Sequence, residues 1–127
     1  MSTHSALVVE DDPDLAMIFS QALRAAGFEV ETVATREAAL ARLAACTPQI
    51  VTLDLHLRQA RGTDILRYIR SEPRLAQVNV VLTTADSAMA EELQDQADVV
   101  LVKPISFVQL RDLAARLKPA DGALVKP

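Results

Sequence analysis

The chain has 127 residues, half of them apolar, and a formal net charge of −4, which suits one domain with a single hydrophobic core. The negative charge argues against a nucleic-acid-binding surface, which needs clustered Lys and Arg. No apolar run approaches the ~20 residues that span a bilayer, and residues 1–7 lack the basic and apolar regions of a signal peptide. Cys46 is the single cysteine and forms no internal disulfide, so we expect a cytoplasmic protein without membrane contact.

Short apolar segments alternate with helical patterns along the chain. The first, Ala6–Val9, predicts a buried strand, and the apolar spacing after Pro13 predicts a helix that stops at Gly27. The same periodicities predict strands at residues 6–9, 28–34, 50–53, 78–85 and 98–103, and helices at residues 13–26, 36–45, 63–72, 87–96 and 106–118. Five such strand–helix units predict an α/β fold with a parallel sheet and helices on both faces.

Polar residues follow or end four of the five predicted strands. Because ligands of such folds bind at the carboxyl ends of the strands, we expect these side chains to converge at one rim of the sheet. They are Glu10, Asp11 and Asp12 after the first strand, Asp54 after the third, Thr84 at the end of the fourth and Lys103 at the end of the fifth.

These residue types suit phosphoryl transfer. Asp54 is a carboxylate that can act as a nucleophile and form an aspartyl phosphate. Glu10 and Asp11 can supply the protein side of a Mg²⁺ site, which neutralises the charge of the phosphoryl oxygens. The Thr84 hydroxyl can donate to a phosphoryl oxygen, and Lys103 can bind the phosphate or, before phosphorylation, pair with Asp54.

The segments V-V-E-D-D, L-D-L-H-L, L-T-T-A and V-K-P, in this order, resemble the receiver domain of two-component response regulators of the chemotaxis-regulator type. The resemblance covers residues 7–118. It implies a flavodoxin-like (βα)5 fold, a doubly wound parallel five-stranded sheet of order 2-1-3-4-5. We expect one receiver domain over residues 1–119, with residues 120–127 as a C-terminal tail or the start of a linker.

The implied function is a phosphorylation-activated signalling switch rather than a turnover enzyme. The switch takes its phosphoryl group from a histidine kinase or a histidine phosphotransfer protein in a Mg²⁺-dependent reaction. Three residues carry this transfer by family analogy: the phosphoacceptor Asp54, the switch hydroxyl of Thr84 and the phosphate-contacting Lys103. The implied metal ligands are the carboxylates of Glu10, Asp11 and Asp54 and the backbone carbonyl of His56. Asp12 has a lesser role.

Further positions match the family pattern. His56 and Asp86 lie two residues beyond Asp54 and Thr84, where family members tune the lifetime of the phosphate. Gly62 matches a glycine in the loop after the third strand. Pro104 matches a proline that follows the lysine through a cis bond.

Three departures concern how the signal leaves the domain. Val100 stands three residues before the lysine, where the family usually has an aromatic switch residue. Arg58 and Ile105 replace a frequent proline and a frequent phenylalanine. The output surface of the family consists of the fourth helix, the fifth strand and the fifth helix, through which a homodimer can form. The sequence identifies neither a downstream partner nor a linked output domain.

Other interpretations stay open at this point. A pseudo-receiver, which binds partners without being phosphorylated, is the alternative that Val100 supports. An aspartate-based phosphatase would need a second aspartate where His56 stands, and an FMN carrier would need a hydroxyl- and glycine-rich loop where the first acids stand. The acids after the first strand could instead begin a helix. Either Thr83 or Thr84 is expected to face the core.

Overall fold

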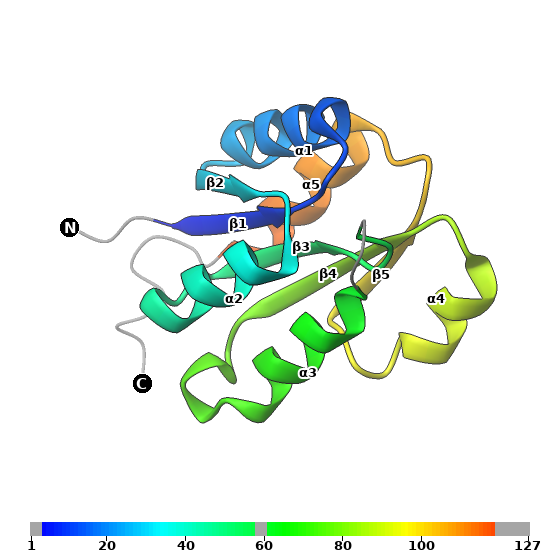
Figure 1. Cartoon of the computed structure of the whole chain (residues 1–127). Coiled ribbons are helices and arrows are strands. Elements are labelled where there is room, and N and C mark those ends of the chain that lie inside the picture. Colours follow the sequence, from blue (N-terminus) through cyan, green and yellow to red (C-terminus); the bar gives the residue numbers. More distant parts are fainter. Residues whose placement is uncertain (1–3, 58–60, 119–127) are drawn as a thin grey trace.

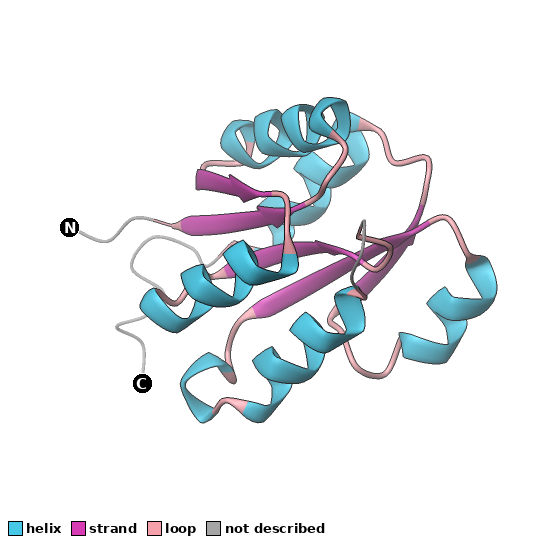
Figure 2. Ribbon diagram, viewed as in Figure 1, coloured by secondary structure: helices cyan, strands magenta, loops and turns pink. Residues whose placement is uncertain are grey.

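The computed structural model describes residues 4–57 and 61–118. They form one parallel sheet of order β2-β1-β3-β4-β5, with helices on both faces (Figures 1 and 2). The elements are β1 Ser5–Val9, α1 Pro13–Ala25, β2 Glu29–Val33, α2 Arg36–Ala45, β3 Ile50–Asp54, α3 Gly62–Ser71, a 3-10 turn Pro73–Leu75, β4 Asn79–Thr84, α4 Ser87–Leu93, β5 Val99–Val102 and α5 Phe107–Leu117. The predicted doubly wound fold and strand order are confirmed.

Local sequence signals set the helix ends. The Asp12 carboxylate accepts hydrogen bonds from the first-turn N–H groups of α1, and Pro13 occupies the first helical position, where its missing N–H costs nothing. Gly27 has a φ of 103° just after α1, a conformation that glycine adopts without a Cβ penalty. Thr35 caps α2 through its hydroxyl.

The sheet separates two apolar layers. One layer packs α2, α3 and α4 against the sheet through residues such as Leu43, Ile65 and Leu93. The other packs α1 and α5 through residues such as Phe19, Leu23 and Leu110. Side chains alternate between the two layers along each strand, and the central strand β3 is buried along its whole length. Because β3 is covered on both faces, it holds the residues that follow it in a fixed position.

Two details differ from the sequence prediction. The fourth helix ends at Leu93 rather than residue 96, because Gln94, Asp95 and Gln96 are exposed and give this turn no apolar contact with the core. The helical spacing after Pro13 includes Ile18 among its apolar positions, but 37% of the Ile18 surface is exposed. The buried apolar residues of α1 are Phe19, Ala22 and Leu23.

Two of the sequence-based expectations concern residues that the structure does not describe. Arg58 and the boundary between residues 119 and 120 lie outside the described residues, so the domain limits stay predictions. None of the described helices has the length and apolar character needed to cross a membrane.

Candidate functional site

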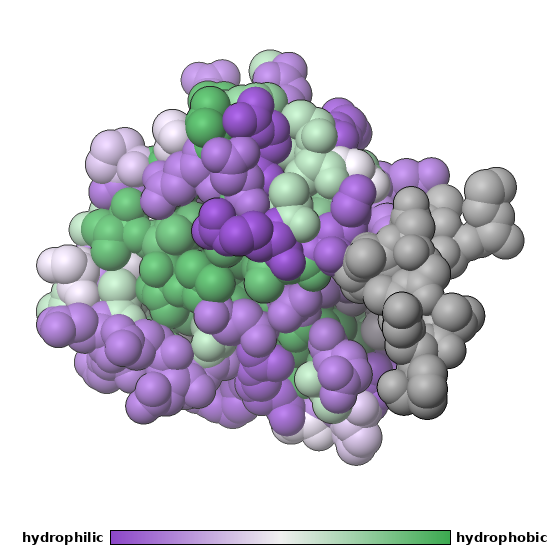
Figure 3. All heavy atoms as spheres, turned by 180° about the vertical axis from the view of Figure 1, so that it is seen from behind, coloured by the Kyte–Doolittle hydropathy of each residue, from purple (hydrophilic) through white to green (hydrophobic). Residues whose placement is uncertain are grey.

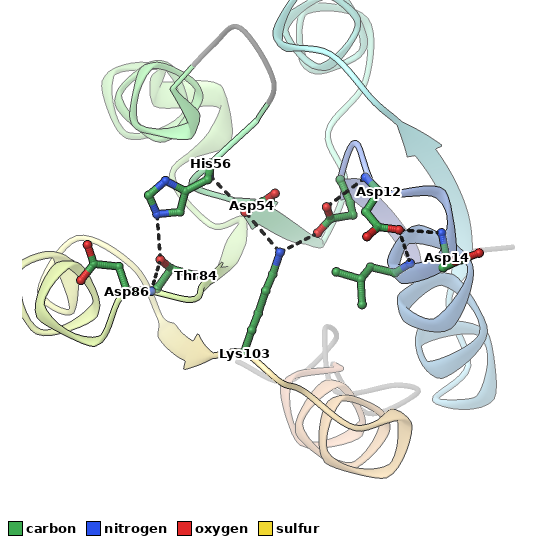
Figure 4. A network of polar contacts seen from close by, with 9 residues as sticks. Asp12, Asp14, Asp54, His56, Thr84, Asp86 and Lys103 are labelled. Atoms are coloured by element: carbon green, nitrogen blue, oxygen red, sulfur yellow. Dashed lines mark hydrogen bonds and ion pairs between the residues drawn. The ribbon is translucent and has the colours of Figure 1, made fainter.

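Backbone hydrogen bonds bring the ends of the strands to one rim of the sheet. The N–H of Glu10 donates to Val33 at 3.1 Å, that of Leu55 to Thr83 at 3.0 Å and that of Lys103 to Thr84 at 2.7 Å. Each bond continues the ladder one step past the strand, so the residues that follow β1, β3 and β5 are fixed relative to their neighbours. Glu10, Asp11, Asp54 and Lys103 converge there as expected, whereas the Asp12 carboxylate turns to the first turn of α1. Figure 4 shows the Lys103 side chain reaching Asp54.

Three carboxylates gather at this rim. One oxygen from each of Glu10, Asp11 and Asp54 lies within 4.8 Å of the other two. Glu10 and Asp54 are nearly fully buried, whereas Asp11 is half-buried. Carboxylates this close repel one another by roughly 4 kcal/mol per pair at an effective dielectric near 20, so the arrangement requires positive charge.

Lys103 supplies part of that charge. Its Nζ lies 3.3 Å from Oε1 of Glu10 and 3.5 Å from Oδ1 of Asp54. The expected pairing with Asp54 is present, and Glu10 is a second partner that the sequence pattern did not suggest. Both acids are nearly buried, so this ion pair is shielded from water far more than a surface pair would be.

The ionisation of Glu10 is shifted mainly by its burial. Burial raises the pKa of Glu10 from 4.5 to about 7, and the nearby Asp54 carboxylate adds to the rise. The backbone N–H of Asp12, which donates to Glu10 at 3.1 Å, and the Lys103 ammonium act in the opposite direction. Lys103 is the ammonium that contacts both Glu10 and Asp54 within this group of carboxylates.

The two neighbouring threonines face opposite sides of the sheet. Thr83 lies between Leu82 and Thr84, and its hydroxyl is buried without a hydrogen-bond partner among the described residues. The Oγ1 of Thr84 instead accepts the N–H of Asp86 at 3.0 Å and lies 3.1 Å from Nε2 of His56. The Thr84 hydroxyl therefore faces the loop that follows Asp54.

The loops that carry His56 and Asp86 have regular local structure. The backbone N–H of His56 donates to Oδ1 of Asp54 at 3.1 Å, which fixes the turn after β3. Asp86 caps α4, because its carboxylate accepts the N–H groups of Ala88 and Met89. Asp86 points away from the acids in Figure 4.

Among the three acids that follow β1, the interpretation as the start of a helix is correct for Asp12 alone.

Gly62 makes room for the backbone at the end of β3. A Cβ at this position would collide with the carbonyl oxygen of Asp54 and would lie 2.8 Å from Cα of Leu55. The N–H of Gly62 also donates to Leu55 at 3.1 Å. The glycine that the resemblance implied is thus required by the close approach of α3 to the end of β3. The Lys103–Pro104 peptide bond is cis, as the same resemblance implied.

The switch position has no aromatic substitute nearby on its own strand. Val100 is half-buried and packs against the layer of α2, α3 and α4. It lines a groove of about 530 Å³ between α4 and β5. Ile105 is buried against α1 and α5 as part of the core.

The donor set fits a hard divalent cation. Mg²⁺ takes oxygen ligands and is usually held by one or two carboxylates together with water and phosphate oxygens. Glu10, Asp11 and Asp54 offer such oxygens at one point, and the half-exposed Asp11 keeps the site accessible to water. The residues present therefore fit the ion.

Known proteins with the same pattern were found by sequence and by structure. A family model described as response regulator receiver domain matches residues 6–115. The phosphate regulon transcriptional regulatory protein PhoB of Rhizobium meliloti is 32% identical over 119 residues, which cover 88% of this chain and 52% of that protein. The chain spans about half the length of the curated relatives it matches.

Two solved structures illustrate the similarity of fold. The signal receiver domain of a Luxo repressor protein from Vibrio parahaemolyticus has a TM-score of 0.83 at 27% identity, with 99% of both chains covered. The receiver domain of sensor histidine kinase PA1611 from Pseudomonas aeruginosa has a TM-score of 0.80 at 24% identity, covering 91% of this chain and 98% of that one. That structure has a magnesium ion coordinated in its active-site cleft.

Proposed function

This chain belongs to the response regulator receiver domain family, a signalling module of two-component systems rather than a turnover enzyme, and we propose that it is a switch phosphorylated on Asp54. The observation that carries the proposal is the meeting of Glu10, Asp11, Asp54 and Lys103 at one rim of the sheet. Asp54 offers a buried carboxylate as nucleophile, and the groups around it match the charge of a phosphoryl group.

The transfer moves a phosphoryl group from nitrogen to oxygen. A carboxylate oxygen of Asp54 forms a bond to phosphorus, while the bond from phosphorus to the imidazole nitrogen of a phosphohistidine breaks and that nitrogen keeps the electron pair. Mg²⁺, when bound, neutralises charge on the phosphoryl oxygens. Glu10, Asp11, Asp54 and the carbonyl of His56 are the proposed ligands. Lys103, already 3.5 Å from Asp54, binds a phosphoryl oxygen as a point charge.

Phosphorylation then shifts the loops after β4 and β5. The Thr84 hydroxyl and Lys103 both move toward the phosphoryl oxygens, and they draw the segment before α4 and the end of β5 with them. The change is a shift between two arrangements that a partner distinguishes. Val100 allows this shift without the rotation of an aromatic ring.

The proposed partners are of two kinds, a phosphodonor and a partner that binds the output surface. The phosphodonor is a sensor histidine kinase or a histidine phosphotransfer protein in the cytoplasm. The proposed output surface consists of α4, β5 and α5. On it, Val102 and Val108 are 42% and 50% exposed. The molecule seen from behind has a broad apolar area (Figure 3). Such a patch suits a second copy of the domain or a downstream protein. A linked output domain is consistent with the relatives, which are about twice as long.

Intact-mass spectrometry tests the proposal. The chain is incubated with Mg²⁺ and acetyl phosphate, and we expect one phosphate adduct that is lost in Asp54→Asn and in excess chelator. Steady turnover of many phosphoesters would instead show a phosphatase. A chain that takes no phosphate under any of these conditions would be a pseudo-receiver.

A further inference from the structure

The side chain of His56 has a contact that the phosphoryl-transfer chemistry does not use. Its Nε2 lies 3.1 Å from Oγ1 of Thr84, across the gap between the loop after β3 and the end of β4 (Figure 4). His56 is exposed, so no packing forces the ring into this position. Thr84, by contrast, is completely buried.

The protons of this contact can be assigned by satisfying each polar group. A threonine hydroxyl has one proton to donate and two lone pairs to accept with. One lone pair of Thr84 already accepts the N–H of Asp86 at 3.0 Å. A buried hydroxyl proton without an acceptor is costly, and among the described residues the acceptor available to it is Nε2 of His56. With the Thr84 hydroxyl as the donor, the ring accepts at Nε2 and has its proton on Nδ1.

The same hydroxyl proton is needed by the phosphorylated state. In the proposed function, Thr84 donates to a phosphoryl oxygen on Asp54, and it has no second proton with which to do so. We propose that His56 is a positioning residue that holds the Thr84 hydroxyl in the unphosphorylated arrangement, so that phosphorylation must break the His56–Thr84 hydrogen bond. This inference rests on the proposed function, because it concerns the same hydroxyl.

The His56–Thr84 contact is also linked, through Asp86, to α4 of the proposed output surface. Asp86 donates its N–H to Thr84, while its carboxylate caps α4 through Ala88 and Met89. A displacement of the Thr84 hydroxyl away from His56 is therefore passed directly to the first turn of α4. His56 thus sets the fraction of molecules that are in the inactive arrangement. A neutral hydrogen bond of this kind changes the equilibrium constant between the two arrangements by roughly 3- to 10-fold.

A double-mutant cycle with beryllium fluoride tests the inference. Beryllium fluoride mimics a phosphoryl group on a carboxylate, and its affinity in the presence of Mg²⁺ can be measured by calorimetry. We expect His56→Ala to bind it roughly 3- to 10-fold more tightly than the wild type. His56→Gln should restore much of the difference, because its amide oxygen can accept the same proton. The effect of His56→Ala should persist beside Thr84→Ser and vanish beside Thr84→Ala.

The outcomes separate this inference from the proposed function. A wild-type chain that binds no beryllium fluoride would overturn both. A wild-type chain that binds it, with His56→Ala equal or weaker, would leave the switch intact and overturn the role of His56. An effect of His56→Ala that survives in Thr84→Ala would also contradict it, because the Thr84 hydroxyl would then play no part.

Discussion

At the scale of single residues, Glu10 is the group whose ionisation the fold disturbs most clearly. Its pKa is raised to about 7 in the folded chain by burial and by Asp54, against 4.5 for an ordinary glutamate. The folded chain thus binds a proton that the unfolded chain has lost between these two pH values. Stability from this group is complete below about pH 4.5 and is lost as the pH rises through about 7.

We therefore predict that, without metal, ionisation of Glu10 lowers the free energy of unfolding by up to roughly 3 kcal/mol as the pH rises. Urea denaturation of the wild type and of Glu10→Gln in chelator, across this range, measures the effect as a difference between the two proteins. The difference should change steadily between the two pKa values. A difference that is constant with pH would contradict the assignment.

Gly62 gives a second prediction for one residue. In Gly62→Ala the new Cβ would meet the backbone of Asp54 and Leu55, so either α3 or the phosphoacceptor loop must shift. We expect a loss of about 2 kcal/mol or more in the free energy of unfolding, together with weaker phosphorylation of Asp54. Thr63→Ala, one position along α3, is the matched control and should lose less of both.

At the scale of elements, the start of α1 separates two roles within one acidic cluster. Asp12 is exposed and accepts the N–H groups of Asp14 and Leu15, whereas Glu10 and Asp11 face the metal site. Asp12→Ala should lower stability by about 1 kcal/mol, and Asp12→Asn should lose much less, since asparagine also caps helices. Thermal denaturation measures both, and equal losses would show that the charge rather than the cap matters.

The elements themselves follow from short signals in the sequence. The strand-helix alternation and the stop at Gly27 were predicted, because each depends on residues a few positions apart. The end of α4 was not, since the helical pattern continues to residue 96 while the last contact with the core is at Leu93. Contacts between elements decide such boundaries, and a single sequence does not show them.

The same limit applies within the site. Acids after strands one and three and a lysine after strand five predicted where the groups meet, because parallel strands end at one rim. The pairing of Lys103 with Glu10 and the contact of His56 with Thr84 depend on side-chain directions across separate loops. No spacing in the sequence contains that information, although the cap at Asp86 could have been predicted from the helix that follows it.

At the scale of the whole molecule, three carboxylates that could hold a metal ion meet at the carboxyl rim of the sheet, and we predict that Mg²⁺ stabilises the folded chain. An ion that binds only the folded state adds about 2.7 kcal/mol at a concentration of 100 times its Kd. The melting temperature should therefore rise with Mg²⁺ and return to its starting value with chelator. Asp11→Asn should reduce the rise, whereas Asp14→Asn, an exposed acid in α1, should leave it in place.

The central claim is that residues from distant parts of the chain form one phosphoryl-accepting site at Asp54, and the modified residue can be identified directly. The tryptic peptide of residues 43–58 contains Asp54 as its single carboxylate side chain. Borohydride reduces an aspartyl phosphate to homoserine, which tandem mass spectrometry locates. After treatment with acetyl phosphate and Mg²⁺ we predict homoserine at position 54, and none in chelator. Homoserine at another aspartate, or at Asp54 to the same extent without metal, would contradict the account.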